Sequence, residues 1–288
     1  MPQREQHKEQ CGFFTIAQNT EDCDYVRLAY LLALSIKATQ SEIKSFAVAV
    51  DDPDAVPEKY RKVFDYIIPI GTDDAKGDKW KLKNEWKSFY LTPFKETIKI
   101  EADMLMTQDI KDWWPLMRQH ELLFTNRITD FRGNFSTKRF YRQVFDNNMM
   151  QDVYNGFMYF RYTKWVNKYF DVVRALFNEW TAINDNVLIK TNEPVPTTDV
   201  VMGVAVKIMN AESKCINPGM SIPSFVHMKA KINGGYKNDD HWPNKLGFFW
   251  QSPKHIKINS VRQHLPIHYH DKSVATDELI SKYEKEIA

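Results

Sequence analysis

The first hundred residues alternate short apolar runs with longer amphipathic ones. Period and length predict buried strands for the short runs and helices for the long ones. Strands are expected at residues 11–17, 45–50, 64–70 and 97–104, and helices at 25–38, capped by Asp24, and at 80–92. Strands that alternate with helices favour a largely parallel sheet covered on both faces. The sequence therefore predicts an α/β fold.

Polar residues follow several of these predicted strands. Gln18, Asp52 and Asp103 all lie where a strand reaches its carboxyl end. In open α/β sheets, ligands bind at the carboxyl ends of the strands. We expect a ligand site at this edge.

Two acids, Glu101 and Asp103, interrupt the fourth apolar run. A buried charge without a partner is strongly disfavoured, and hard divalent cations take carboxylate oxygens. Side chains two residues apart on a strand point to the same face, so one ion could contact both acids. The alternative is a pair of acids at a strand end that face solvent.

Composition limits the class of protein. The chain has 288 residues with 43% hydrophobic content and a net charge of +2, enough for a real core. It has no apolar run long enough to cross a membrane, and its polar start lacks the apolar segment of a signal peptide. Three widely spaced cysteines predict reduced thiols and a cytoplasmic protein.

Positive charge is concentrated in two regions that are also rich in aromatic residues. Residues 126–170 hold eight Lys or Arg against three acids, and residues 227–262 hold seven against two. Basic groups bind phosphates, and flat rings stack on unpaired bases. The alternative is that most rings belong to the core and the charges form a solvated face.

Three further features concern the second half of the chain. The proline-containing stretch 191–198 predicts an internal seam, and residues 276–286 predict a final helix started by Thr276. His268 and His270 would share one face of a strand, as a zinc pair does. With no obvious third ligand, an ordinary surface strand is the favoured interpretation.

The order of five segments resembles that of GT-A-fold, nucleotide-sugar-dependent glycosyltransferases, nearest in layout to the glycogenin-like retaining family. The segments are FFTIAQNTEDCDYVRLAYLLALSIK (13–37), IKIEADMLM (98–106), VYNGFMYFR (153–161), PTTDVVMGVAV (196–206) and SFVHMKAKI (224–232). The likeness covers roughly residues 11–250 and lies in the order of motifs more than in identity.

The resemblance implies one GT-A-like catalytic domain over residues 1–288, built on a Rossmann-like, mixed and mostly parallel sheet flanked by helices. Residues 11–110 would form the nucleotide-binding half and residues 111–250 the sugar and acceptor half. Residues 251–288 would form a C-terminal extension.

The resemblance also implies site residues. Glu101, Asp103 and His227 would hold Mn²⁺ or Mg²⁺, and Asn155 and Asp199 would face the sugar and the acceptor as catalytic residues. The candidate contacts to the nucleotide are Ala17, Gln18, Asn19, Asp52, Lys83, Lys229 and Lys231. Departures from the family pattern are a Glu in place of the first Asp and a single acid in the fourth segment. A buried structural histidine at position 227 and a helix cap at position 199 remain alternatives.

The expected activity is transfer of a sugar from a nucleoside diphosphate, with UDP favoured, to a hydroxyl acceptor. The basic aromatic regions favour a polyanion, and a likeness in style to phage enzymes favours a hydroxymethylated pyrimidine in double-stranded DNA, modified in the host cytoplasm. The alternatives are a non-catalytic nucleic-acid-binding protein, and a glycosyltransferase that acts on a protein or a small glycan. The oligomeric state and the sugar stay open.

Overall fold

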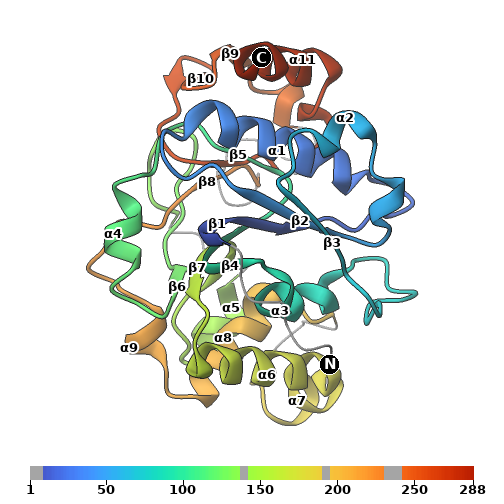
Figure 1. Ribbon diagram of the computed structural model, residues 1–288. Coiled ribbons are helices and arrows are strands. Elements are labelled where there is room, and N and C mark those ends of the chain that lie inside the picture. Colours follow the sequence, from blue (N-terminus) through green and yellow to red (C-terminus); the bar gives the residue numbers. More distant parts are fainter. Residues whose placement is uncertain (1–8, 137–141, 190–194, 230–241) are drawn as a thin grey trace.

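A six-stranded mixed sheet forms the centre of the protein (Figure 1). The computed structural model describes residues 9–136, 142–189, 195–229 and 242–288. The strand order is β3-β2-β1-β4-β7-β6. The strands span Glu9–Ile16 (β1), Phe46–Val50 (β2), Tyr66–Pro69 (β3), Phe94–Ile100 (β4), Leu122–Thr125 (β6) and Tyr154–Arg161 (β7). The first four in this order are parallel, whereas β7 runs antiparallel to both β4 and β6.

Helices cover both faces of this sheet (Figure 1). Helices α1 (Tyr25–Thr39) and α11 (Asp277–Ile287) lie on one face, and α6 (Lys164–Asn178) and α8 (Thr198–Ile208) on the other. The shorter helices are α2 (Glu58–Arg61), α3 (Ser88–Leu91), α4 (Trp113–Met117), α5 (Gln143–Asn147), α7 (Trp180–Asn186) and α9 (Glu212–Cys215). Short 3₁₀ turns are η1 (Pro53–Ala55), η2 (Leu82–Lys87), η4 (Trp242–Asn244) and η5 (Lys272–Val274). The α/β prediction is confirmed.

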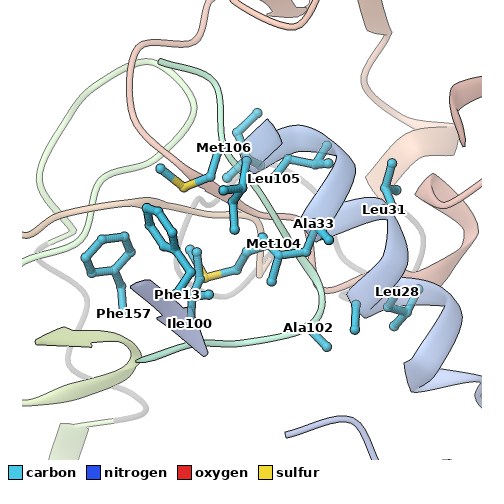
Figure 2. Packing of buried hydrophobic residues seen from close by; sticks show 14 of the residues in the cluster. Phe13, Leu28, Leu31, Ala33, Ile100, Ala102, Met104, Leu105, Met106 and Phe157 are labelled. Atoms are coloured by element: carbon cyan, nitrogen blue, oxygen red, sulfur yellow. The ribbon is translucent and has the colours of Figure 1, made fainter. Parts of the chain in front are cut away.

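Apolar packing on the α1 side of the sheet holds the strand ends in place. Figure 2 shows Phe13 of β1 and Ile100 of β4 beside Met104, and Leu28 and Leu31 of α1 belong to the same buried cluster. Each of these side chains is nearly or fully buried. Because a close-packed core leaves little room for movement, this cluster holds the end of β4 in position.

Several predicted boundaries need correction. The run at 97–104 is not one strand, because β4 ends at Ile100, its last residue paired with β7. A turn follows, and β5 (Met104–Leu105) begins a second sheet. The predicted helix at 80–92 is a 3₁₀ turn followed by one α-helical turn. The predicted helices at 25–38 and 276–286 are confirmed, and the side chains of Asp24 and Thr276 cap them.

Two smaller sheets complete the fold. In one, β12 (Ile267–His268) lies between β5 and β8 (Val226–His227). In the other, β9 (Phe248–Ser252), β10 (His255–Ile258) and β11 (Val261–Arg262) pair antiparallel. Among the helices of the described ranges, none is long and apolar enough to cross a bilayer.

The aromatic residues of the window 126–170 are mostly core. Eight of its described rings are buried: Phe131, Phe145, Tyr154, Phe157, Tyr159, Phe160, Tyr169 and Phe170. Its Arg142 is buried as well, and Lys138 and Arg139 lie outside the described residues. Arg127, Arg132, Lys164 and Lys168 are exposed, so the described part of the window agrees with the alternative of core rings and solvated charges. The stretch 191–198 is described only from residue 195, and α8 begins at Thr198.

Candidate active site

The acids Glu101 and Asp103 lie in the turn that follows β4. The Glu101 N–H donates to the carbonyl of Gly156 on β7, at 3.0 Å, and the Tyr269 N–H donates to the carbonyl of Asp103, at 3.2 Å. The turn is thereby fixed between the central sheet and the C-terminal segment. The two carboxylates are brought together by this turn and not by strand alternation.

His268 completes a three-residue group. Its Nε2 lies 3.1 Å from Asp103 Oδ2 and 3.3 Å from Glu101 Oε2. One potential ligand atom from each residue falls within 4.8 Å of the other two. Two carboxylates and an imidazole form an oxygen and nitrogen donor set that suits a divalent transition metal such as Mn²⁺. The described residues therefore fit the metal that the sequence predicted.

The surface position predicted for His268 is wrong. Only 7% of its surface is exposed, because β12 is the middle strand of its sheet. The further donor atoms missing from the sequence interpretation lie on Glu101 and Asp103, far away in the chain. His270 has left the strand, with a backbone φ of 59°.

A lysine lies against the same carboxylate. The Lys272 ammonium forms an ion pair with Asp103 Oδ2. Burial opposes ionisation of Asp103, but the charges of His268 and Lys272 outweigh it and hold the pKa of this carboxyl well below its usual value. Burial of Glu101 raises the pKa of its carboxyl, and His268 only partly offsets that effect. The site is thus built for a strongly acidic Asp103 beside a more easily protonated Glu101.

His227, the predicted ligand, lies beside this group. It is in register with His268 on the neighbouring strand β8, and the two ring centroids are 4.5 Å apart. Its Nδ1 accepts a hydrogen bond of 3.2 Å from the Lys229 N–H. Burial, followed by the charges of His268 and Lys229, lowers the pKa of His227 well below its usual value. His227 is therefore an uncharged side chain that lies beside His268, and its role as a metal ligand stays a prediction.

Asn155 and Asp199 meet on the other side of the acids. The Asn155 N–H donates to Asp199 Oδ1, at 2.7 Å, and Arg142 Nη2 donates to Asp199 Oδ2, also at 2.7 Å. Asn155 Nδ2 donates to Glu85 Oε2, at 3.3 Å, and Glu85 in turn forms a 2.7 Å ion pair with the buried Lys99. Asp199 thus bridges β7 and the segment before α5 from the first turn of α8, which is more than a helix cap does.

Two features of β7 lie close to this group and to Glu101. The Oδ1 atom of Asn155 is buried and has no hydrogen-bond partner among the described residues. A Cβ atom at Gly156 would lie 3.3 Å from Glu101 Oε2 and 3.1 Å from the Phe225 ring. A larger residue here would fill the space beside Glu101. The glycine keeps this space open, and the preceding residue, Asn155, has an amide oxygen without a hydrogen-bond partner among the described residues.

Residues of the predicted nucleotide loop are mostly buried or hydrogen-bonded to other parts of the protein. Ala17 is buried, and Asn19 Oδ1 accepts from the Val26 N–H at 3.1 Å, which caps α1. Gln18 lies between two partners, donating to Asp51 Oδ1 and accepting from Asn84 Nδ2, both at 2.6 Å.

The remaining predicted nucleotide contacts have different surroundings. Asp52 caps η1 by accepting from Asp54, and Lys83 forms an ion pair with Asp78 at 3.0 Å. Lys229 lies next to His227, whereas Lys231 is outside the described residues. Asp51, and not Asp52, is therefore the acid that is hydrogen-bonded to Gln18 and, through it, connected to Asn84.

Sequence reasoning missed Lys272, Tyr25 and Arg142. The Lys272 ammonium lies 5.4 Å from the centre of the Tyr25 ring, at the first residue of α1. The available signal was the spacing HYHDK, in which a lysine follows a buried-strand histidine by four residues. Arg142 was counted as part of a surface charge patch, although its guanidinium is stacked on the Tyr154 ring at 3.6 Å.

A groove opens next to this site. It consists of two adjoining cavities of about 280 and 290 Å³ that share Asn126 and Asp152. Tyr154 lines the first, two residues from Gly156 on the same face of β7. Phe135 also lines it, 52% exposed, with the Arg127 guanidinium 5.7 Å from its ring centre. The groove offers a flat apolar surface, a cation and polar groups beside the acids.

Comparison with solved structures places the fold. The chain is similar to an active-site mutant of LgtC, with a TM-score of 0.50 and 13% identity over 96% of this chain and 94% of that one. It is similar to mouse xyloside xylosyltransferase 1 (0.51, 8% identity, 90% and 97%) and to the bifunctional glycosyltransferase WbbM (0.53, 11% identity, 99% and 51%). At these identities the likeness shows the fold alone, which is the GT-A fold of these glycosyltransferases.

Coverage of some matches is partial. The chain spans 46% of the length of the glycosyltransferase GlyE of Streptococcus pneumoniae TIGR4 and about half of WbbM. No protein-family model matches the sequence, and no curated protein matches it either.

Proposed function

We propose that this protein is a metal-dependent glycosyltransferase that moves a sugar from a nucleoside diphosphate, most suitably UDP, to a hydroxyl acceptor. The observation that carries the proposal is the Glu101, Asp103 and His268 group at the carboxyl end of β4, with Lys272 beside it. A divalent ion, Mn²⁺ or Mg²⁺, supplies charge stabilisation to the departing diphosphate when bound there. The GT-A fold of the chain supports the same reading.

Lys272 supports the diphosphate half of the reaction. Its ammonium is a compact point charge next to the carboxylates that would hold the ion. As negative charge develops on the departing phosphate, an ammonium fixed in this place stabilises it without reorganisation. The Tyr25 ring, under Lys272 at the start of α1, offers a flat surface to the nucleoside.

Asn155 and Asp199 support the sugar half. The unpartnered Oδ1 of Asn155 can accept a hydrogen bond from a sugar hydroxyl, and Asp199 orients the Asn155 backbone from the far side. We propose Asn155 as the residue that contacts the donor sugar and Asp199 as its positioning residue. Retention at the sugar carbon is proposed on the resemblance to the glycogenin-like family alone.

The groove beside Tyr154 is the proposed acceptor site. A hydroxymethylated pyrimidine in DNA is the acceptor that we propose, because its ring can stack on the exposed Phe135 under Arg127. A base within a duplex must leave the stack to reach such a groove. The three cysteines are free thiols, which supports the proposed cytoplasmic setting.

Calorimetric titration of UDP with and without Mn²⁺ tests the donor half. We expect Mn²⁺-dependent binding that Asp103→Asn abolishes and Asp112→Asn leaves unchanged. The control makes the same chemical change at an exposed acid. Metal-independent binding in both variants would rule out the proposed site.

A second pair of variants decides between the histidines. We expect His268→Gln to remove Mn²⁺-dependent UDP binding, because His268 Nε2 faces both carboxylates. His227→Gln should keep it, since Nδ1 of His227 is engaged by the backbone of Lys229. The reverse result would return the ligand role to His227.

Sugar-transfer assays test the acceptor half. Wild-type protein with Mn²⁺ and a panel of UDP-sugars should glycosylate hydroxymethylated DNA and not unmodified DNA. Transfer to a free saccharide in its place would establish the small-glycan alternative.

A further inference from the structure

The small sheet of β9, β10 and β11 has one buried and one exposed face. Ile256 and Ile258 of β10 are fully buried in the core of the α1 side. Side chains alternate between faces along a strand, so Lys257 points the other way. It is in register with Phe249 of β9 on one side and with Arg262 of β11 on the other. The outward face therefore carries a row of three side chains, one from each strand: the aromatic ring of Phe249 and the cations of Lys257 and Arg262.

This row is unusually positive for the chain. Residues 241–270 contain four Lys or Arg and no Asp or Glu. Within the described ranges, neither Lys257 nor Arg262 forms an ion pair with a carboxylate. Burial, then the charges of Arg262, Lys257 and His264, lowers the pKa of the neighbouring His255. The face is complementary to a polyanion.

The exposed ring is held in place. Phe249 is 54% exposed, yet one edge of its ring lies against Gly247, where a Cβ atom would come within 2.5 Å of the ring carbon Cε2. Asn259 fixes this glycine with two hydrogen bonds, one from the Gly247 N–H to Oδ1 at 2.8 Å and one from the Asn259 N–H to the Gly247 carbonyl at 2.7 Å. A ring that is already oriented loses little conformational freedom when another flat group stacks on it.

The row is connected to the acceptor groove. Gln263, next to Arg262, donates from Nε2 to the Phe131 carbonyl at 2.9 Å. The guanidinium of Arg132 lies 4.4 Å from the Phe131 ring centre and is about half exposed. The two ends of the same segment, residues 126–128 and 135–136, line the groove beside Tyr154. A strand that reached the groove could therefore continue over Arg132 onto the small sheet.

We infer that the outward face of β9–β11 binds single-stranded DNA, with phosphates on Lys257 and Arg262 and one base stacked on Phe249. Duplex DNA hides the ring faces of its bases, so it offers this surface only phosphates. A membrane is the poorer fit, because interfacial binding needs a broad apolar face and this sheet exposes one ring. Docking is independent of catalysis, whereas its use to hold the acceptor strand rests on the proposed function.

Fluorescence anisotropy of a labelled oligothymidylate with the full-length protein tests the inference. Lys257→Glu with Arg262→Glu should weaken binding at least tenfold and reduce the slope of log affinity against log salt by about 1 to 1.5, as loss of two phosphate contacts requires. Phe249→Ser should weaken binding about tenfold with an unchanged salt slope, as loss of one stacked base does.

The matched control is Lys164→Glu with Lys168→Glu. It makes the same change in charge at two exposed lysines of α6, on the opposite face of the central sheet (Figure 1). Equal weakening by the control pair and the sheet pair would show a general charge effect and overturn the inference. Wild-type affinity in Phe249→Ser would also overturn it. So would binding of phosphatidylglycerol vesicles without binding of DNA.

The Mn²⁺-dependent binding of UDP, measured in the same variants, separates this inference from the proposed function. We expect it unchanged, because no residue of the row contacts the metal-binding acids. DNA binding that follows the expected pattern in a protein that never binds UDP would refute the proposed function and leave the docking surface standing. UDP binding without any DNA binding would overturn the docking surface and leave the proposed function standing.

Discussion

The pair of Arg142 and Asp199 allows a sharp prediction, because the two partners are unequally buried. The Arg142 side chain is 8% exposed and that of Asp199 is 31% exposed, at a distance of 2.7 Å. Breaking a buried ion pair costs about 3–5 kcal/mol when it leaves an uncompensated buried charge. Which partner is left behind therefore decides the cost.

Asp199→Asn should be the more damaging change. It removes the hydrogen-bonded carboxylate from the buried guanidinium, which keeps the Val153 carbonyl, the Tyr154 ring and the nearby charge of Asp152, and the new amide group can turn a donor toward it. We expect a loss of about 3 kcal/mol. Arg142→Met leaves a carboxylate that water can reach and that still accepts from the Asn155 N–H, so we expect about 1–2 kcal/mol.

Unfolding in guanidinium chloride measures both variants and the double mutant. Because the double mutant contains neither charge, it should lose less than the sum of the two, with a coupling of about 1–3 kcal/mol. Equal losses in the two single variants, adding up in the double mutant, would refute the reasoning that unequal burial governs this pair.

Three other changes test the fold. A Cβ atom in Gly203→Ala would lie 2.7 Å from the Phe145 ring, so we expect a loss of about 1–3 kcal/mol; stabilisation, the usual effect of alanine in a helix, would contradict this contact. Burial and nearby cations lower the pKa of His270 to about 3, so its neutral form favours the folded state and stability should fall as pH drops from about 6.5 toward 3. His270→Asn, which tolerates the positive φ, should show a smaller decrease in chemical-denaturation stability between pH 7 and pH 5; an unchanged decrease would be contrary. Thr276→Ala removes the oxygen that accepts from the Leu279 N–H and should cost about 1 kcal/mol of unfolding free energy, whereas Thr276→Ser should not.

Local sequence patterns predicted much of the secondary structure. The apolar alternation placed β1, β2 and α1 within one or two residues of their observed bounds, because side-chain period and helix capping act over a few residues. The strand predicted over 97–104 failed because the end of β4 is set by where its partner β7 stops pairing. Strand length in this sheet depends on a neighbour about 57 residues away in the chain.

Aromatic and charged residues show the limit of composition. Phe131, Phe157 and Phe249 all lie in windows of similar charge, yet two of them are core and one is an exposed ring over Gly247. Arg142 reads as one more basic residue in the sequence, and in the structure it is a buried partner of Asp199. Composition counts such residues, and only packing assigns each to a face.

The sequence by itself determined the α/β fold and singled out Glu101 and Asp103 as the acids to explain. Tertiary structure alone decided which histidine and which lysine join them. His268 and Lys272 reach Asp103 across 165 and 169 residues of chain. They do so because β12 is the middle strand between β5 and β8, and α11 holds the following segment against α1. Residue pattern encodes the local period of a chain, whereas contacts between distant segments arise only when whole elements pack together.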